Sequence, residues 1–126
     1  MTLHLRTTVT AVGPDVPDLL DGGVLILFAD GAPPELAEVA VLHAVADGPS
    51  EAAPLPGTPI RIGGLEAQLT GIGDAAWAKV RDIGHVVVNF NGASAPDRLG
   101  ELTASEVDGD ALKAALVPGA EIVIGG

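Results

Sequence analysis

Glycine and proline interrupt this chain so often that they leave little room for long helices. The 126 residues include 17 glycines and 10 prolines, which separate apolar runs of only a few residues. Proline disrupts a helix interior, and glycine weakens regular elements while it favours turns. Short apolar runs between turn signals are typical of strands. We therefore expect a mainly β fold, a small closed or nearly closed β-barrel with a few short helices.

The same punctuation predicts where the elements lie. Strands are expected over residues 3–12, 24–28, 39–45, 57–64, 65–73, 85–90, 101–104 and 120–126. Short helical segments are expected around 17–20, within 30–39, and over 74–84 and 110–117. Asp74 is the expected N-cap of the 74–84 helix, and Gly84 is expected to end it.

Two strand segments resemble each other. AAPLPGTPIRIGG at 52–64 and AALVPGAEIVIGG at 114–126 share Pro-Gly, Ile-x-Ile and Gly-Gly. Pro-Gly forms a turn, and Ile-x-Ile then places two β-branched side chains on one face of a strand. This echo either marks two related halves that close a barrel or is simply a favourable way to begin a strand, and we favour the second reading.

Charge and cysteine content exclude several classes of protein. Six lysines and arginines stand against 17 aspartates and glutamates, a net charge of −11, so nucleic acid is not an expected partner. The acidity suits a basic protein partner or simply keeps the chain in solution. The absence of cysteine excludes disulfides and thiolate chemistry. Residues 1–10 lack the apolar core of a signal peptide, so we expect a cytoplasmic protein.

His43 is the residue that most invites a chemical interpretation, because it lies inside the apolar run VAVLHAVADG. On a strand it shares a face with Val41 and Val45. It is either a hydrogen-bonded core histidine or a nucleophile held on a rigid scaffold. A neutral imidazole accepts a phosphoryl group near pH 7. Asp47 either orients this ring or belongs to the turn Asp-Gly-Pro, and the turn is favoured.

The two other histidines have weaker signals. His85 begins the strand HVVVNF, and the two imidazoles can approach if the strands of His43 and His85 are neighbours. A second imidazole there could fix the tautomer of His43 and bond phosphate oxygens. His4 is expected to be an exposed residue of the first strand. The histidine spacing matches no metal motif, and no dinucleotide or P-loop pattern is complete, so neither metal nor cofactor is expected.

Longer stretches carry a resemblance to a known family. TLHLRTTVTAVG, ILFADGAPPELAEVAVLH and LTGIGDAAWAKVRDIGHVVVNFNG resemble the glucitol/sorbitol-specific enzyme IIA component of the bacterial phosphoenolpyruvate-dependent phosphotransferase system. The most specific pieces are F-x-x-G-A-P-x-x-L at 28–36, the histidine seven residues after Leu36, and I-G-H-V at 83–86. The resemblance runs over essentially the whole chain, so residues 1–126 are expected to form one domain of this type.

The resemblance implies a cytoplasmic phosphocarrier with a mainly β fold. Its phosphorylated histidine corresponds to His43, which would receive a phosphoryl group from the histidine phosphocarrier protein. The group would then pass to enzyme IIB, which with IIC takes up and phosphorylates glucitol/sorbitol or a related polyol. His85 corresponds to a second histidine, with a supporting role; a homo-oligomer is left open. Val45 and Leu55 stand where the family pattern has further histidines, and a non-catalytic regulatory or binding barrel is the alternative.

Overall fold

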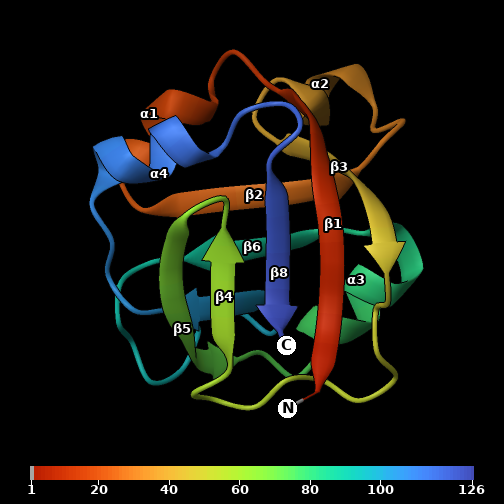
Figure 1. The fold of residues 1–126 in the computed structure, drawn as a ribbon, viewed down its shortest axis with the longest axis vertical. Helices are drawn as coiled ribbons and strands as arrows, with labels where there is room; N and C mark the ends of the chain where they lie inside the picture. Colours follow the sequence, from red (N-terminus) through yellow and green to blue (C-terminus); the bar gives the residue numbers. More distant parts are fainter. Residues whose placement is uncertain (1) are drawn as a thin grey trace.

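A computed structural model describes residues 2–126, which form a closed barrel of eight strands with four short helices around it (Figure 1). The strands are β1 (Leu3–Val12), β2 (Val24–Ala29), β3 (Val41–Asp47), β4 (Pro59–Ile62), β5 (Leu65–Ile72), β6 (Val86–Asn89), β7 (Glu101–Ala104) and β8 (Glu121–Gly125). The helices are α1 (Val16–Asp21), α2 (Pro34–Ala37), α3 (Ala76–Ile83) and α4 (Gly109–Ala115). The predicted fold class is confirmed.

The strands follow one another around the barrel in the order β1-β3-β2-β6-β7-β5-β4-β8, and β8 pairs with β1 to close it. Two neighbouring pairs, β2 with β3 and β6 with β7, are parallel, and the others are antiparallel. The first and last strands lie side by side, because β1 and β8 pair from Leu3↔Gly125 onward (Figure 1). Closure leaves no sheet edge to attract a further strand.

Alternate strand residues fill the barrel interior, as period-2 patterning requires. The buried strand side chains are almost all aliphatic, among them Leu5, Val9, Leu25, Leu27, Ile60, Ile62, Leu69, Val86, Val88, Leu102, Ile122 and Ile124. Among residues 2–126, only three buried residues are polar or charged: Thr7, His43 and Thr103. A buried polar side chain must find a hydrogen-bond partner or destabilise the fold, so these three are the positions where the interior is specialised.

The two similar segments are neighbours in the barrel. β4 and β8 are antiparallel partners, with Ile60 opposite Ile124 and Ile62 opposite Ile122. All four isoleucine side chains are buried. The repeated Ile-x-Ile therefore supplies one patch of the core from two adjacent strands.

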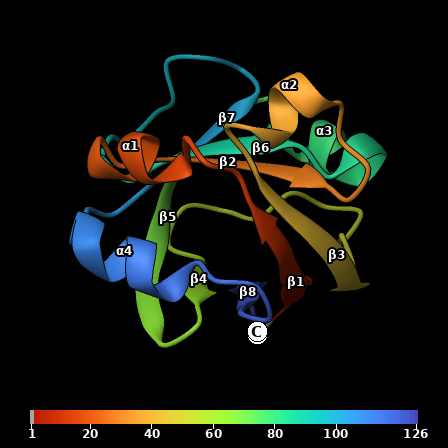
Figure 2. The same ribbon diagram turned by 90° about the horizontal axis from the view of Figure 1, so that it is seen from above.

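Helix α3 covers the barrel beside β6, whereas α1 and α4 pack against each other at another part of the wall (Figure 2). Gly84 ends α3 in the left-handed conformation, with φ of 63°, as expected. The predicted Asp74 cap is wrong. The helix begins one residue later, with Ala75 at the N-cap position and no side-chain cap hydrogen bond.

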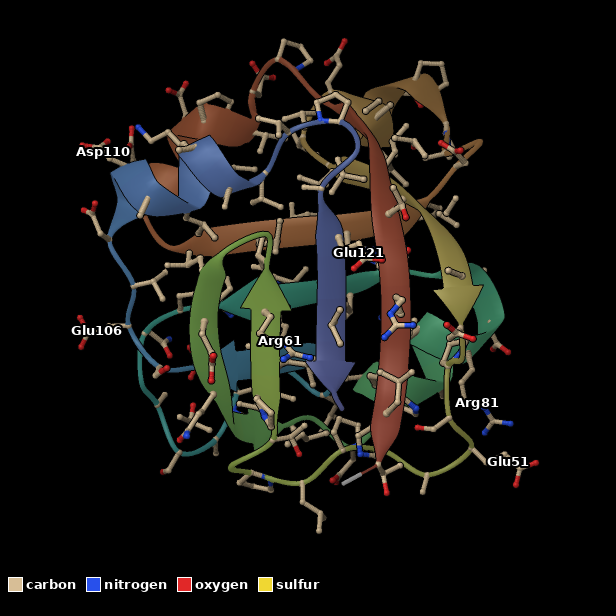
Figure 3. All side chains as sticks on the ribbon, in the orientation of Figure 1. Glu51, Arg61, Arg81, Glu106, Asp110 and Glu121 are labelled. Carbon is tan, nitrogen blue, oxygen red and sulfur yellow. The ribbon has the colours of Figure 1, made fainter. Side chains whose placement is uncertain are left out.

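Charged side chains lie on the outside of the barrel. Arg61 on β4 and Glu121 on β8 are exposed beside buried isoleucines, and Glu106 and Asp110 extend from the loop and helix that follow β7 (Figure 3). The negative charge of the chain is therefore spread over the surface rather than buried. None of the helices within residues 2–126 combines the length and hydropathy that a membrane crossing requires.

Candidate functional site

His43 lies inside the barrel wall and is only 1% exposed. Val41 shares this inward face and is fully buried, whereas Val45, which pairs with the buried Thr7 on the same face, is 41% exposed. The reason is the end of a neighbouring strand. β2 pairs with β3 only from Leu27↔Val41 to Ala29↔His43, and residues beyond His43 extend past the doubly paired part of the wall.

Hydrogen bonds occupy both nitrogens of the His43 ring. Nε2 lies 2.7 Å from the carbonyl oxygen of Gly84, and Nδ1 lies 2.6 Å from the Thr7 hydroxyl. A carbonyl only accepts, so Nε2–H is the donor to Gly84. In the neutral ring Nδ1 is then the acceptor, and it receives the Thr7 hydroxyl hydrogen. The ring is held in one tautomer with no lone pair free.

Burial also sets the charge of this ring. Desolvation lowers the pKa of the His43 imidazole from its ordinary value, while the hydrogen bond to Gly84 and the carboxylate of Asp30 act in the opposite direction. The net effect favours the uncharged form. This agrees with the expected neutral imidazole. In the described structure the ring is sealed from the surface.

His85 lies on the other side of the wall. Its Nδ1 is 3.0 Å from the carbonyl oxygen of Leu27, which it must meet as a donor, and its ring packs on Phe28 with centroids 4.9 Å apart. No buried side-chain nitrogen or oxygen among residues 2–126 lacks a partner. Nε2 of His85 has no partner within this described range, and it therefore reaches the surface.

The two rings do not form the pair that the sequence suggested. Strand β2 lies between β3 and β6, so the strands of His43 and His85 are not neighbours. Thr7 and Gly84, rather than His85, fix the tautomer of His43. The link between the two histidines is the backbone, because the carbonyl that receives Nε2–H belongs to the residue directly before His85.

Asp47 does not orient His43. Its carboxylate accepts a hydrogen bond from Arg6 at 3.2 Å on the exposed part of β3. Asp47 is the last residue of β3, and Gly48 and Pro49 follow the strand. Within residues 2–126, no group of three or more His, Asp or Glu side chains is placed to hold a metal ion.

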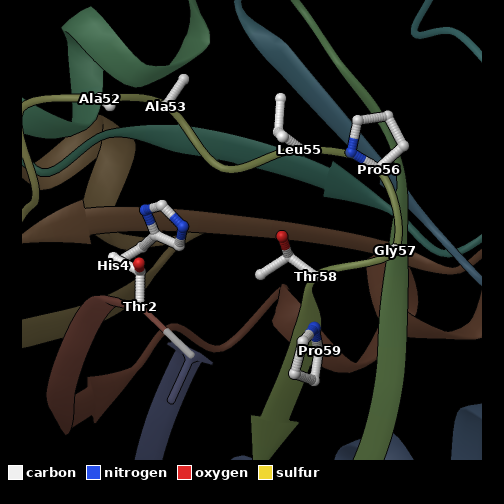
Figure 4. A pocket seen from close by; sticks show the side chains of 9 residues that line it. All are labelled: Thr2, His4, Ala52, Ala53, Leu55, Pro56, Gly57, Thr58 and Pro59. Carbon is white, nitrogen blue, oxygen red and sulfur yellow. The ribbon is translucent and has the colours of Figure 1, made fainter.

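His4 lines a surface pocket of about 530 Å³ (Figure 4). The other residues of the wall are Thr2, Ala52, Ala53, Leu55, Pro56, Gly57, Thr58 and Pro59. Nδ1 of His4 is 2.7 Å from the Ser50 hydroxyl, which itself donates to the Ala52 carbonyl at 2.8 Å. Trp77 packs edge-on against the ring, with centroids 6.0 Å apart.

Sequence reasoning missed this pocket. Because His4 alternates with the buried Leu5, the strand pattern correctly predicts that His4 points away from the core. In the structure its side chain is partly covered rather than freely exposed. The cover is a proline-rich segment about fifty residues later in the chain. Proline content predicts a stiff loop there. No local pattern indicates that the loop returns to the first strand.

Comparisons with known proteins agree with this architecture. A family model described as the PTS system glucitol/sorbitol-specific IIA component matches residues 4–125. PTS system glucitol/sorbitol-specific EIIA components of Shigella flexneri and Escherichia coli are each 34% identical to this chain over 92 residues, which is 73% of this chain and 73% of each relative. The crystal structure of a PTS system IIA component from Enterococcus faecalis is similar in fold, with a TM-score of 0.73 and 21% identity over 94% of this chain and 97% of that chain.

Proposed function

We propose that this chain, which belongs to the glucitol/sorbitol-specific IIA family of the phosphotransferase system, carries a phosphoryl group between two proteins of that system. The donor is the histidine phosphocarrier protein. The acceptor is enzyme IIB, which uses the group for uptake and phosphorylation of glucitol/sorbitol or a related polyol. The exchange takes place in the cytoplasm and needs no cofactor. The observation that carries the proposal is the family match over residues 4–125, which contains all three histidines.

His43 is the proposed acceptor. Its ring is uncharged, since burial lowers its pKa, and an uncharged imidazole has a lone pair that can attack phosphorus. A new N–P bond forms as the donor's N–P bond breaks, and the donor imidazole retains that electron pair. Such a step depends on in-line placement of two protein surfaces more than on further catalytic groups.

Acceptance at His43 requires a local opening, because both of its nitrogens are hydrogen-bonded. Nδ1 has the lone pair, so the Thr7 hydroxyl must move away from it, while Nε2–H keeps its hydrogen bond to Gly84, the left-handed link between α3 and β6. The exchange of one such hydrogen bond for water costs about 1 kcal/mol. His85 directly follows this link, and its surface Nε2 can, once protonated, donate to a phosphoryl oxygen. This is the supporting role that we propose for it.

One observation favours a second function, a regulatory or binding barrel without phosphoryl transfer. His43 is 1% exposed and fully hydrogen-bonded, which is also how a structural histidine is held. In this case the barrel would bind its partners but would not be phosphorylated.

Incubation with phosphoenolpyruvate, enzyme I and the histidine phosphocarrier protein separates these functions. If this chain is a phosphocarrier, it gains an acid-labile phosphoryl group, which intact-mass measurement detects and peptide mapping locates. His43→Asn should remove the label at this position, and His85→Asn should slow labelling without abolishing it. Fluorescence of the single Trp77 reports whether each variant has folded. A wild-type chain that gains no phosphate would establish the regulatory alternative.

A further inference from the structure

His4 has a fixed tautomer that leaves Nε2 with its lone pair. The Ser50 hydroxyl has one hydrogen, and it donates that hydrogen to the Ala52 carbonyl. It therefore accepts from Nδ1–H of His4, at 2.7 Å. In the neutral ring the proton is on Nδ1, and Nε2 is the unprotonated nitrogen.

Nε2 of His4 is also accessible. It has no hydrogen-bond partner among residues 2–126. Every buried side-chain nitrogen or oxygen in this range has a partner, so Nε2 of His4 is not buried. The ring projects into the pocket, on the side that faces Thr58 (Figure 4). His43 contrasts with this arrangement, because both of its nitrogens are engaged and sealed.

The ring is held from two directions. Ser50 holds Nδ1, and the backbone of Ser50 is in turn fixed by a 2.8 Å hydrogen bond from its N–H to the His4 carbonyl. Trp77 donates Nε1–H to the Ser50 carbonyl at 2.7 Å and packs edge-on against the imidazole. A ring with a fixed orientation loses little further freedom when a reaction partner arrives.

The walls suit contact with a protein that delivers a phosphoryl group. Of the nine lining residues, five are Ala, Leu or Pro, and none has a carboxylate or a permanently charged side chain. Apolar walls exclude water when a second surface docks. The Glu51 carboxylate, next in sequence to the lining residues, points away from the barrel (Figure 3). A phosphoryl dianion in the pocket would thus meet no fixed negative charge from its walls, and the Thr58 hydroxyl can donate to it.

We infer that Nε2 of His4 is a second phosphoryl acceptor of this chain, open to a phosphohistidine donor in the closed barrel. The inference rests on the proposed function, since the histidine phosphocarrier protein is the donor. The Nε2 lone pair forms an N–P bond while the donor's N–P bond breaks, and the donor imidazole leaves with that electron pair. Nδ1 keeps its proton, so the phosphorylated ring is an imidazolium that still donates to Ser50.

Site mapping after labelling by phosphoenolpyruvate, enzyme I and the histidine phosphocarrier protein tests this inference. We expect phosphate on His4 in the wild-type chain, its retention on His4 in His43→Asn, and its loss from this position in His4→Asn. Thr8→Val is the matched control, because Thr8 lies on the same strand as His4 but does not line the pocket. It should leave labelling of His4 unchanged.

Ser50 is a positioning residue in this scheme. Ser50→Ala should slow labelling of His4 by about tenfold, the effect of one orienting hydrogen bond, and Ser50→Thr should restore it. Imidazole ¹⁵N NMR gives an independent readout, in which His4 should have its proton on Nδ1 in the wild-type chain.

The outcomes separate the two proposals. Phosphate on His43 or His85 alone, with His4→Asn labelled like the wild type, overturns the inference and leaves the proposed function standing. A proton on Nε2 of His4 in the NMR spectrum also overturns it. A wild-type chain with no phosphate at any histidine overturns both.

Discussion

The hydrogen bond between Thr7 and His43 offers a sharp test of how the barrel tolerates a polar ring in its wall. Thr7→Val keeps the branched shape of the side chain and removes only the hydroxyl that donates to Nδ1 at 2.6 Å. Both residues are buried, at 0% and 1% exposure, so water does not replace the lost donor in the native structure. The substitution leaves a buried acceptor without a partner.

An unsatisfied buried acceptor costs about 1–3 kcal/mol, and we expect Thr7→Val to lower the free energy of unfolding by that amount. Urea unfolding followed by circular dichroism measures it, with an unchanged m-value as the sign that only stability has altered. Thr8→Val is the matched control. It lies next on the same strand, pairs with both neighbouring strands through its backbone, and its side chain is only partly buried.

A double-mutant cycle isolates the pair. His43→Leu removes the acceptor, and the cost of Thr7→Val should then shrink, because no unpaired nitrogen remains. Equal costs of Thr7→Val in the wild-type and His43→Leu backgrounds would refute the assignment of a hydrogen bond. A loss no larger than that of Thr8→Val would refute the claim that the polar pair stabilises the barrel.

Three further perturbations follow from the same geometry. Burial lowers the pKa of folded His43 from its ordinary 6.5, so the stability that its neutral ring provides is fully present above about pH 6.5. This stability is lost as the pH falls towards the folded pKa, by at most about 1.4 kcal/mol per pH unit. The difference in unfolding free energy between wild type and His43→Leu, followed against pH, measures the loss, and parallel curves would contradict it. Gly84→Ala places a Cβ on a residue in the left-handed region, 2.9 Å from Ala29 Cβ and 3.3 Å from His43 Nε2. It should lower the free energy of unfolding by more than the roughly 1–2 kcal/mol that the left-handed conformation alone costs, and an unchanged urea midpoint would refute the close packing. Trp77→Phe removes the donor to the Ser50 carbonyl and should cost about 1 kcal/mol in urea unfolding and slow labelling of His4, whereas wild-type rates would show that the tryptophan does not position the pocket.

Local chemistry was enough to predict the elements of this barrel. Glycine and proline mark the ends of nearly every strand, and the alternation of apolar residues gives the buried face of each. Gly84 ends α3 as expected, because a left-handed residue is easiest for glycine. The strand bounds of β1 and β7 agree with the predicted ranges 3–12 and 101–104.

Long-range pairing explains what the sequence could not predict. Val45 is exposed because β2 stops pairing with β3 at His43, and this depends on where β2 ends, at Ala29. The partner of His43, Thr7, is 36 residues away, and that of His4, Ser50, is 46 residues away. Periodicity assigns a side chain to one face of its strand, whereas the order of the strands determines which residues the side chain contacts on that face.

Strand β1 connects the two candidate sites, and the difference between them is chemical rather than positional. It supplies His4 at the pocket and Thr7 to the inward ring of His43. A nitrogen whose lone pair accepts a hydrogen bond cannot attack phosphorus until that bond opens. The hydrogen bond to the unprotonated nitrogen of His43 therefore distinguishes this ring from His4 as strongly as its burial does. Thr7→Val therefore frees a lone pair on His43 without exposing it. If labelling of His43 rises in this variant, the wall opens often enough for a donor to reach it; if only His4 is labelled, the closed barrel is the form that reacts.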